Sequence, residues 1–324
     1  MSAFREAIAK EVRKELMNPE FDSRRSKNGG RVFWVKLAAA TGFGQFVKEH
    51  PAYDDNVAAV HVTMSSAAGA VVADRGDEIR VTEGHTETFT KAFCLSTAGV
   101  RWVGEGSGTK VPALTVSGGV HGVAVEGAGV EFDNFRFPIP GADEALSMIR
   151  VKAAGCTVQN IVGLASGTRV EGSATETNNF IDCIRIVAGA DDFTLNNIRL
   201  DSTPGAVPNS FLSFEGAVSR FTSAGFYATG SVGTAGVIDA SGARQKGSYI
   251  RDWRIAVGGS AKPAVTLDTV SSEGMVHDCF FAGTDTTLAT NAQFAGDWRR
   301  SQVYVSEAAG NLVQGALTPA VDTD

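Results

Sequence analysis

Adjacent pairs of acidic residues are the groups in this sequence that are most able to do chemistry. Enzymes that cleave glycosidic bonds use two carboxyl groups, one as an acid and the other as a base or nucleophile. The candidate pairs are Asp54–Asp55, Asp143–Glu144 and Asp191–Asp192. The second pair follows the sequence PIPG and the third directly precedes an apolar run, so turn formation is the simpler interpretation of both.

The segment EGHTET (83–88) contains Glu83, His85 and Glu87 at every second position, which would place them on one face of a strand. An imidazole beside carboxylates could bind a metal ion or assist proton transfer. No further ligand stands close by in the sequence, so an exposed strand edge is the simpler interpretation. We assign no catalytic residue, metal ion or cofactor from the sequence.

No familiar catalytic or nucleotide-binding motif occurs in the sequence. The glycine-rich segment GEGSGTK (104–110) lacks the spacing of a phosphate-binding loop and is interpreted as a turn. Cys94, Cys156, Cys183 and Cys279 are far apart, which favours buried free thiols over a zinc site or disulfides. The sequence favours a protein that is not an enzyme, although acids contributed by separate segments would leave no motif.

Composition indicates a globular chain rich in short strands. The 324 residues are 43% hydrophobic and 20% charged, with 37 glycines and a net charge of -7. An acidic chain has no electrostatic attraction for a polyanion, so nucleic-acid binding is not expected. No segment approaches the roughly 18 apolar residues of a membrane span, and the charged first residues do not resemble a secretory signal. We expect synthesis in a cytoplasm and no membrane association.

A polar residue recurs between two apolar residues in six segments. In each segment an apolar residue stands two places before the polar one and another stands one place after it. This step of three is odd, so both apolar side chains point inward only if the strand bends between them. Asn and Asp tolerate the left-handed backbone that such a bend needs. We therefore predict corners at Asn134, Asn160, Asn197, Ser223, Asp252 and Asp278.

The corners are separated by 26, 37, 26, 29 and 26 residues. A near-constant period with one long excursion, which contains GSATETNNF, indicates stacked coils with one looped-out insertion. The sequence predicts an all-β, right-handed parallel β-helix in which the corners lie above one another. The opening coils would contain DEIRV (77–81) and VRWVG (100–104). A second sheet would be formed by ALTV (113–116), MIRV (148–151), CIRIV (183–187), SFLSF (210–214), GVID (236–239) and AVTL (264–267).

The two ends of the chain differ from this repeat. We expect an N-terminal helix and linker arm (1–30), a strand and helix cap (31–76), the β-helix (77–300) and a C-terminal tail (301–324). In the cap, RVFWVKL (31–37) indicates a strand, and 55–73 indicates a helix or a mixed pair of elements.

The arm has an apolar stripe at helical spacing, followed by basic residues in the linker. Such a helix either caps the first coil of its own chain or docks on another protein or a symmetry mate. Its contact residues would be Phe4, Ile8, Val12, Leu16, Arg24 and Arg25.

The order of these segments resembles a group of tailed-bacteriophage virion proteins with a pectin-lyase-like β-helix. In that group a GD-x-I-x-V-x-x-GH-x-ET segment opens the coils, and the match here is GDEIRVTEGHTET, Gly76 to Thr88. The resemblance covers about residues 31 to 285, from GGRVFWV to the coils of the GCTVQN type. The insert LAAATGFGQFVKEHPAYDD departs from the pattern, as does the lack of a long C-terminal domain.

The resemblance implies a structural component of the virus particle, commonly trimeric, and carries over no catalytic residue. The first hypothesis is therefore a homotrimeric capsid decoration or cement protein, which binds the major capsid protein or another virion protein without turnover. The alternative is a tail-associated β-helix that binds or cleaves glycans. Its outer groove would be lined by Asp191, Asp192, Asp252 and Trp253, although Trp253 at an inward position is more simply a core residue.

Overall fold

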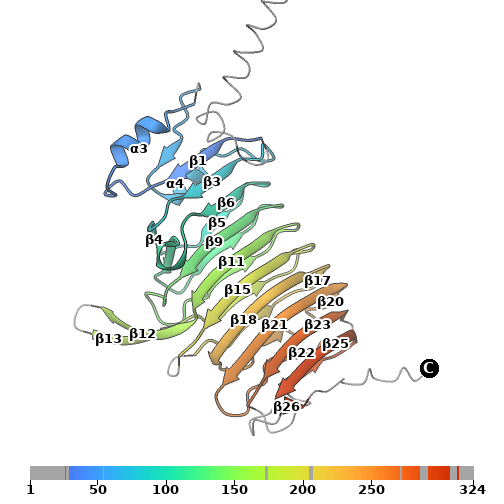
Figure 1. Ribbon diagram of the computed structural model, residues 1–324. Helices are drawn as coiled ribbons and strands as arrows, with labels where there is room; N and C mark the ends of the chain where they lie inside the picture. The colour runs from blue at the N-terminus through green and yellow to red at the C-terminus, as the bar shows by residue number, and fades with distance from the viewer. Residues whose placement is uncertain are drawn as a thin grey trace, which may run out of the picture.

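The computed structural model describes residues 26, 29–53, 55–171, 174–203, 207–270, 272–284, 291–306 and 312–313. Their strands stack into a parallel β-solenoid (Figure 1), which confirms the predicted all-β parallel β-helix. The arm residues Phe4, Ile8, Val12, Leu16, Arg24 and Arg25 lie outside the described residues. No helix in the described part of the chain is long and apolar enough to cross a membrane.

A sheet of 14 strands forms one side of the solenoid. All its pairs are parallel except β25–β26, so each coil repeats the direction of the one before. Two further strands join this sheet beside β9: β7 (Ala113–Val116) pairs with β9, and β4 (Thr86–Phe89) pairs with β7. Its main path is β2 (Val60–His61), β1 (Val32–Val35), β3 (Glu78–Val81), β6 (Arg101–Gly104), β9 (Glu131–Phe137), β11 (Thr157–Leu164), β15 (Thr194–Asp201), β18 (Thr222–Ser231), β21 (Ser248–Gly258), β23 (Glu273–Ala282), β25 (Asp297–Ser306) and β26 (Leu312–Val313).

A second parallel sheet of eight strands faces the first across the core. Five of the six runs predicted for it belong to it. The exception is ALTV, which is β7 of the 14-stranded sheet, called the long sheet below, because Ala113 pairs with Arg136 of β9. The strands are β24 (Ala292–Phe294), β22 (Val265–Leu267), β19 (Val237–Asp239), β16 (Ser210–Phe214), β14 (Asp182–Ile186), β10 (Ser147–Val151), β8 (His121–Val125) and β5 (Phe93–Leu95).

Two small sheets of two strands each stand apart from these two sheets in the described residues. A small parallel pair, β17 (Val218–Ser219) with β20 (Gln245–Lys246), lies between the second sheet and the next corner. The antiparallel hairpin of β12 (Ser166–Glu171) and β13 (Ala174–Asn179) projects from the stack (Figure 1). Its second strand, ATETNN, belongs to the GSATETNNF segment of the long interval, which confirms the predicted looped-out insertion.

The bends of the long sheet lie where the sequence steps by three residues between two inward apolar side chains, which we call the odd-step rule. Asn134 has a φ of 63°, and the flanking Phe132 and Phe135 are both fully buried, with their rings stacked at 4.2 Å. A left-handed backbone is also present at Asn160, Asn197, Asp252 and Asp278. The residues on either side of each bend pair in register from β9 to β25, so the bends lie above one another.

The corner predicted at Ser223 is wrong. Gly225, with a φ of 68°, occupies the bend of that coil, since Asn196 and Ile198 of the preceding coil pair with Ala224 and Phe226. Ser223 points into the core, where its Oγ accepts a hydrogen bond from Trp253 Nε1 at 2.9 Å. A further bend lies at Gln302, with a φ of 53°. We call Asn134, Asn160, Asn197, Gly225, Asp252, Asp278 and Gln302 the corner row.

Additional elements extend both ends of the stack. At the start, β1 and β2 extend the long sheet, and the segment 55–73 is a mixed pair in which β2 precedes α4 (Met64–Ala68). The insert that follows β1 contains α3 (Phe43–Glu49), and Phe46 packs edge-on against Trp34 at 5.5 Å. At the other end β26 pairs antiparallel with β25. β26 thereby occupies the edge of β25 at Val305 and Ser306.

Candidate binding surface on the long sheet

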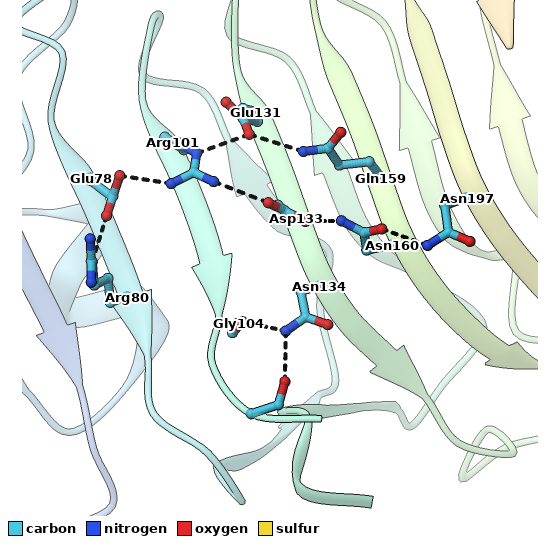
Figure 2. Close-up of polar contacts among 11 residues, drawn as sticks. Glu78, Arg80, Arg101, Gly104, Glu131, Asp133, Asn134, Gln159, Asn160 and Asn197 are labelled. Carbon is cyan, nitrogen blue, oxygen red and sulfur yellow. Dashed lines mark hydrogen bonds and ion pairs between the residues drawn. The ribbon is translucent and has the colours of Figure 1, made fainter. Parts of the chain in front are cut away.

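A network of buried and half-buried charges crosses the outer face of the first coils (Figure 2). The Arg101 guanidinium donates to Glu131 at 2.9 Å, to Glu78 at 2.9 Å and to Asp133 at 3.1 Å. Glu78, whose side chain is 1% exposed, also accepts from Arg80 at 2.5 Å. Burial alone would lower the pKa of Arg101, but its bonds to Glu131 and Glu78 outweigh this and raise it. The guanidinium is therefore fixed as a cation joining three coils.

The network continues along neighbouring coils through amide side chains. Gln159 donates to Glu131 at 3.2 Å, and Asn160 donates to Asp133 at 2.7 Å. Asn197 then donates to Asn160 Oδ1 at 2.6 Å. Figure 2 shows this chain of contacts running from β3 to β15. Each carboxylate in it is bonded to a cation or an amide, which is an arrangement for holding coils in register rather than for transferring protons.

The residues Glu83, His85 and Glu87 do not converge on one point. His85 is buried, and its Nε2 lies 3.0 Å from Glu87 Oε2, which also accepts from the backbone N–H of Met64 at 2.9 Å. Glu83 is exposed and lies 3.7 Å from Lys110. The His85–Glu87 pair thus satisfies an amide at the start of α4. Within the described ranges no group of three or more His, Cys, Asp or Glu side chains could hold a metal ion.

The acidic pairs act mainly at turns. Asp191 accepts from the backbone N–H of Ser219 at 2.7 Å, and Asp192 forms a bidentate ion pair with Arg220 at 2.5 and 2.6 Å. Hydrogen bonding to Arg220 lowers the pKa of Asp192.

The first two acidic pairs behave similarly. In the Asp143–Glu144 turn, Asp143 accepts from the N–H of Glu144 at 3.0 Å. Asp55 pairs with Arg31 at 2.8 Å, while Asp54 lies outside the described residues.

The outer groove predicted from the sequence exists at a different set of residues. Trp253 is fully buried against Phe226, with ring centroids 5.2 Å apart, and Asp191 and Asp192 do not line the groove. Of the four predicted residues only Asp252 lies in it. The groove consists of two adjacent depressions that share Asn197 and Tyr227 on the outer face of β15, β18 and β21.

The first depression has a volume of about 500 Å³ and lies around Gly225. It is lined by polar groups of three coils, among them Asn196, Tyr249 and Arg251. The second, of about 590 Å³, continues along the strands to Phe280 of β23 and is more apolar, with Ala228 and Ala256 in its floor. Both depressions are shallow and open to solvent, so a ligand bound there would lie on the outer face of the solenoid.

Tyr227 separates the two depressions. Its side chain is 39% exposed, and its hydroxyl donates to Asp252 Oδ2 at 2.8 Å. That hydrogen bond is the main reason why the pKa of Tyr227 is raised. Asp252 Oδ1 lies 3.2 Å from Arg254, which is also 3.6 Å from Asp278. The ring is therefore held in place by a neighbour on the next coil while one face of the side chain stays accessible.

Sequence reasoning missed Tyr227 although both corner positions, Ser223 and Gly225, give it an outward direction, because they differ by two residues and leave the faces of the strand unchanged. Once Gly225 is the bend, Tyr227 stands two places after it, an outward position on the strand. The same step identifies Arg199 and Arg254 as outward residues of the neighbouring coils. An exposed aromatic residue at an outward position was thus the available signal.

The thiols differ from expectation at one position. Cys156, Cys183 and Cys279 are buried and free, whereas Cys94 is exposed. Burial raises the pKa of Cys279 to about 11 and also raises that of Cys183. The three buried thiols therefore act as small apolar groups of the core.

Compared with models of known protein families and with curated proteins, this chain matches none. Its parallel β-solenoid is thus established by the structure, and its function is argued below from its own residues.

Proposed function

We propose that this chain is a non-enzymatic structural protein of a tailed-bacteriophage particle, a capsid decoration protein that binds the major capsid protein. The proposal rests on the contacts of Gly76–Thr88. This is the segment that carries the resemblance to such virion proteins. Its polar residues join the N-terminal cap to the first coils of the solenoid.

Asp77 is the centre of this junction. Its fully buried carboxylate accepts from the backbone N–H groups of Arg31 and Val72, both at 2.9 Å, and from Arg75 at 2.6 Å through both oxygens. One side chain thereby joins the start of β1, the end of the cap and the first coil. Burial of a carboxylate is unfavourable unless hydrogen-bond donors surround it, so the position of Asp77 depends on these contacts.

The rest of the segment makes equivalent contacts. Thr82 Oγ1 donates to the carbonyl of Val35 at 3.1 Å, and Glu87 accepts from Met64 at the start of α4. Ile79 and Val81 fill the core of the first coil. The segment is therefore a joint between cap and solenoid, as expected if the resemblance reflects a shared way of starting the coils.

The stiffness of the fold also supports a structural function. Parallel coils paired in register make a stiff body with long, regular faces, which is suited to repeated contact with a lattice or with sister subunits. In this proposal the arm residues Phe4, Ile8, Val12, Leu16, Arg24 and Arg25 attach the solenoid to the capsid or hold a homotrimer together. The solenoid then stands exposed on the particle.

The test is the amount of protein on purified particles, measured by quantitative mass spectrometry. Replacing the four apolar arm residues by Ser should remove most of the protein from the particle while the soluble protein keeps its circular dichroism spectrum. The matched control places Ser at Glu6, Lys10, Glu11 and Lys14 of the same segment and should stay bound. Unchanged occupancy of the apolar variant would contradict the proposed anchoring.

Copy number separates the capsid from the tail. A shell protein should be present at on the order of hundreds of copies per particle, and a tail protein at roughly three to eighteen. The low number would favour the alternative, a tail-associated solenoid that binds or cleaves glycans, for which the groove around Tyr227 is the supporting observation. Depolymerisation of host capsular or lipopolysaccharide glycans by the purified protein would establish cleavage.

A further inference from the structure

An arginine stands at a core position in the last coil of the long sheet. Val276 of β23 is fully buried and pairs in register with Arg300 of β25, which lies two residues before the bend at Gln302. Arg300 is half-buried and is the only charged member of this column of paired residues. From β9 to β25 the column contains Phe132, Val158, Leu195, Ser223, Ile250, Val276 and Arg300.

The Arg300 side chain crosses the end of the core to the second sheet. Its Nη2 donates to the carbonyl of Phe294 on β24 at 2.9 Å, and its Cζ lies 5.4 Å from the centre of the Phe294 ring. Its Nε is buried and has no acceptor among the described residues. Trp298 packs against the same ring at 5.4 Å, and its buried Nε1 also lacks an acceptor there. Buried donors without acceptors are rare in folded proteins, so this end of the core is incomplete.

Arg300 also lacks an opposite charge. Arg101 in the first coils donates to three carboxylates, whereas Arg300 forms no ion pair within the described part of the chain. Burial lowers the pKa of Arg300, and no carboxylate offsets this effect. Because a half-buried cation without a partner is unfavourable, the end of the core is suited to receive a carboxylate.

The direction of β26 leads the chain toward this arginine. β26 is antiparallel to β25, with Leu312 opposite Ser306 and Val313 opposite Val305. Each further residue of an antiparallel strand lies one step back along its partner, so continued pairing would bring Thr318 opposite Arg300. The next residue, Pro319, has no N–H group and would end the pairing.

The sequence beyond β26 has the charge that Arg300 lacks. Residues 314–324, QGALTPAVDTD, lie outside the described residues and contain Asp322 and Asp324 but no Lys or Arg. Asp322 stands four residues after Thr318, a reach of roughly 13 Å for an extended chain, and packed sheets lie about 10 Å apart. A chain that turns inward at Pro319 therefore brings Asp322 to the guanidinium beside Phe294.

The short tether favours these acids over acids of other molecules. Asp322 is nine residues beyond Val313, which is paired with β25. Attachment of this kind gives an effective concentration in the millimolar range, well above that of a free partner in dilute solution.

We propose that residues 314–324 dock on the C-terminal end of the solenoid, where the acidic stretch Asp322–Asp324 pairs with Arg300. Residues 314–318 continue β26 along the edge of β25, Pro319 ends the pairing, and the following residues cross the end of the core. The docked segment thus completes the last coil and covers its strand edge. This docking is independent of the virion assignment, because it depends only on residues of the last coil and on the sequence that follows them.

The first test is zero-length crosslinking of the full-length protein. A carbodiimide activates a carboxylate, and a lysine amine in contact with it displaces the activating group to form an amide, with the carbodiimide released as its urea. Arg300→Lys places an amine at the proposed contact and should link to Asp322 or Asp324, as read by mass spectrometry of the digested protein. Ser301→Lys is the matched control, because Ser301 is the next residue of β25 and is exposed. Its link to the same acids should be at least about tenfold weaker.

Three outcomes of this test decide between the possible occupants. A link to Asp322 or Asp324 within one chain, found with Arg300→Lys alone, supports the proposal. No link, or an equal link with Ser301→Lys, would overturn it. A link between two chains, seen as a dimer on a denaturing gel, would overturn the assignment to the same chain and indicate a second copy as the occupant.

The second test keeps Arg300 and measures hydrogen exchange of the β25 amides by mass spectrometry. Asp322→Asn combined with Asp324→Asn removes the acids and should speed exchange between Asp297 and Tyr304 at least about fivefold, because charged hydrogen bonds are among the stronger ones. Glu49→Gln combined with Glu83→Gln is the matched control, since it removes the same charge from exposed positions elsewhere. Exchange that is equal in the two double variants would overturn the proposal, even if Arg300→Lys does not fold.

Discussion

Tyr227 and Asp252 lie on neighbouring coils and are joined by a hydrogen bond of 2.8 Å on the outer face of the solenoid. The bond stabilises the protonated phenol beside a carboxylate and so raises the pKa of Tyr227. A raised pKa in the folded state means that this contribution is complete below the ordinary tyrosine value of about 10 and is lost as the pH rises through the shifted one.

We therefore expect Asp252→Asn to lower the pKa of Tyr227 toward the ordinary value. The change is measurable as phenolate absorbance during a pH titration, with Tyr227→Phe identifying the contribution of this residue among the four tyrosines. Identical titration curves for wild type and Asp252→Asn would show that the hydrogen bond has no effect on the phenol.

Removing Arg101 should destabilise the solenoid strongly. Arg101→Met removes the cation that Glu78 and Asp133 share, although Glu78 keeps Arg80 and Asp133 keeps the amide of Asn160, so the free energy of unfolding should fall by about 1.5–3 kcal/mol. Arg80→Met is the matched control, because Arg80 is 39% exposed and its loss should cost less than about 1 kcal/mol. Urea denaturation of both variants provides the comparison, and equal losses would contradict the central position given to Arg101.

The stability of variants at a corner should depend on the backbone strain of the left-handed bend. Asn160 has a φ of 56°, so Asn160→Ala should lower stability by about 1–2 kcal/mol from strain, in addition to the loss of its side-chain hydrogen bonds. Asn160→Gly relieves the strain and should retain more stability, although Gly ordinarily weakens a strand. Thermal unfolding of the two variants tests the order, and a less stable glycine variant would argue against the left-handed bend.

The correction at Ser223 can be tested with one residue type at two positions. Ser223→Asn should overfill the core beside Trp253 and cost about 1–3 kcal/mol. Gly225→Asn should change the free energy of unfolding by less than about 1 kcal/mol, because Asn tolerates the left-handed backbone and its Cβ would meet its nearest neighbours at 3.6 Å, an ordinary contact distance. The opposite order in a denaturation experiment would restore Ser223 as the corner.

The cysteines should differ in reactivity. Cys94 is the exposed thiol, so iodoacetamide should label one of the four cysteines in the folded protein and all four after unfolding, as read by mass spectrometry. Burial, followed by the charge of Glu126, raises the pKa of Cys94, so labelling should be slow near neutral pH and accelerate as the thiolate forms. Labelling of Cys183 in the folded state would contradict its burial.

Most of the architecture could be predicted from the corners because bends of a solenoid use few residue types. Asn134, Asn160 and Asn197 each stand between inward apolar residues, so the odd step identifies them. The rule failed where an inward residue is polar. Ser223 points into the core to accept a hydrogen bond from Trp253 of the next coil, a partner that the local sequence cannot reveal.

The outer surface was harder to predict than the core. The contacts of Arg101 come from residues 23 to 32 positions away, and they become neighbours only when the coils are stacked in their true register. The groove depends on that register in the same way, since a corner placed at Ser223 hides Gly225 as the bend of its coil. Residue type alone suggested Trp253 for the groove, whereas its inward position beside the Asp252 corner had already indicated the core, where it is buried.

The hairpin of β12 and β13 leaves the stack after Ala165 and rejoins it at Phe180, whose backbone N–H donates to the carbonyl of Ala165 at 2.9 Å. The coil is thus closed at the base of the hairpin, and β11 and β15 remain paired on either side. Ser166, Asn178 and Asn179 at the base are buried and bond to neighbouring coils, but the sequence between Ser166 and Asn178 can lengthen, shorten or be exchanged without shifting any later coil. The position is therefore suited to the display of foreign peptides, and in nature to rapid divergence on an otherwise constrained rod.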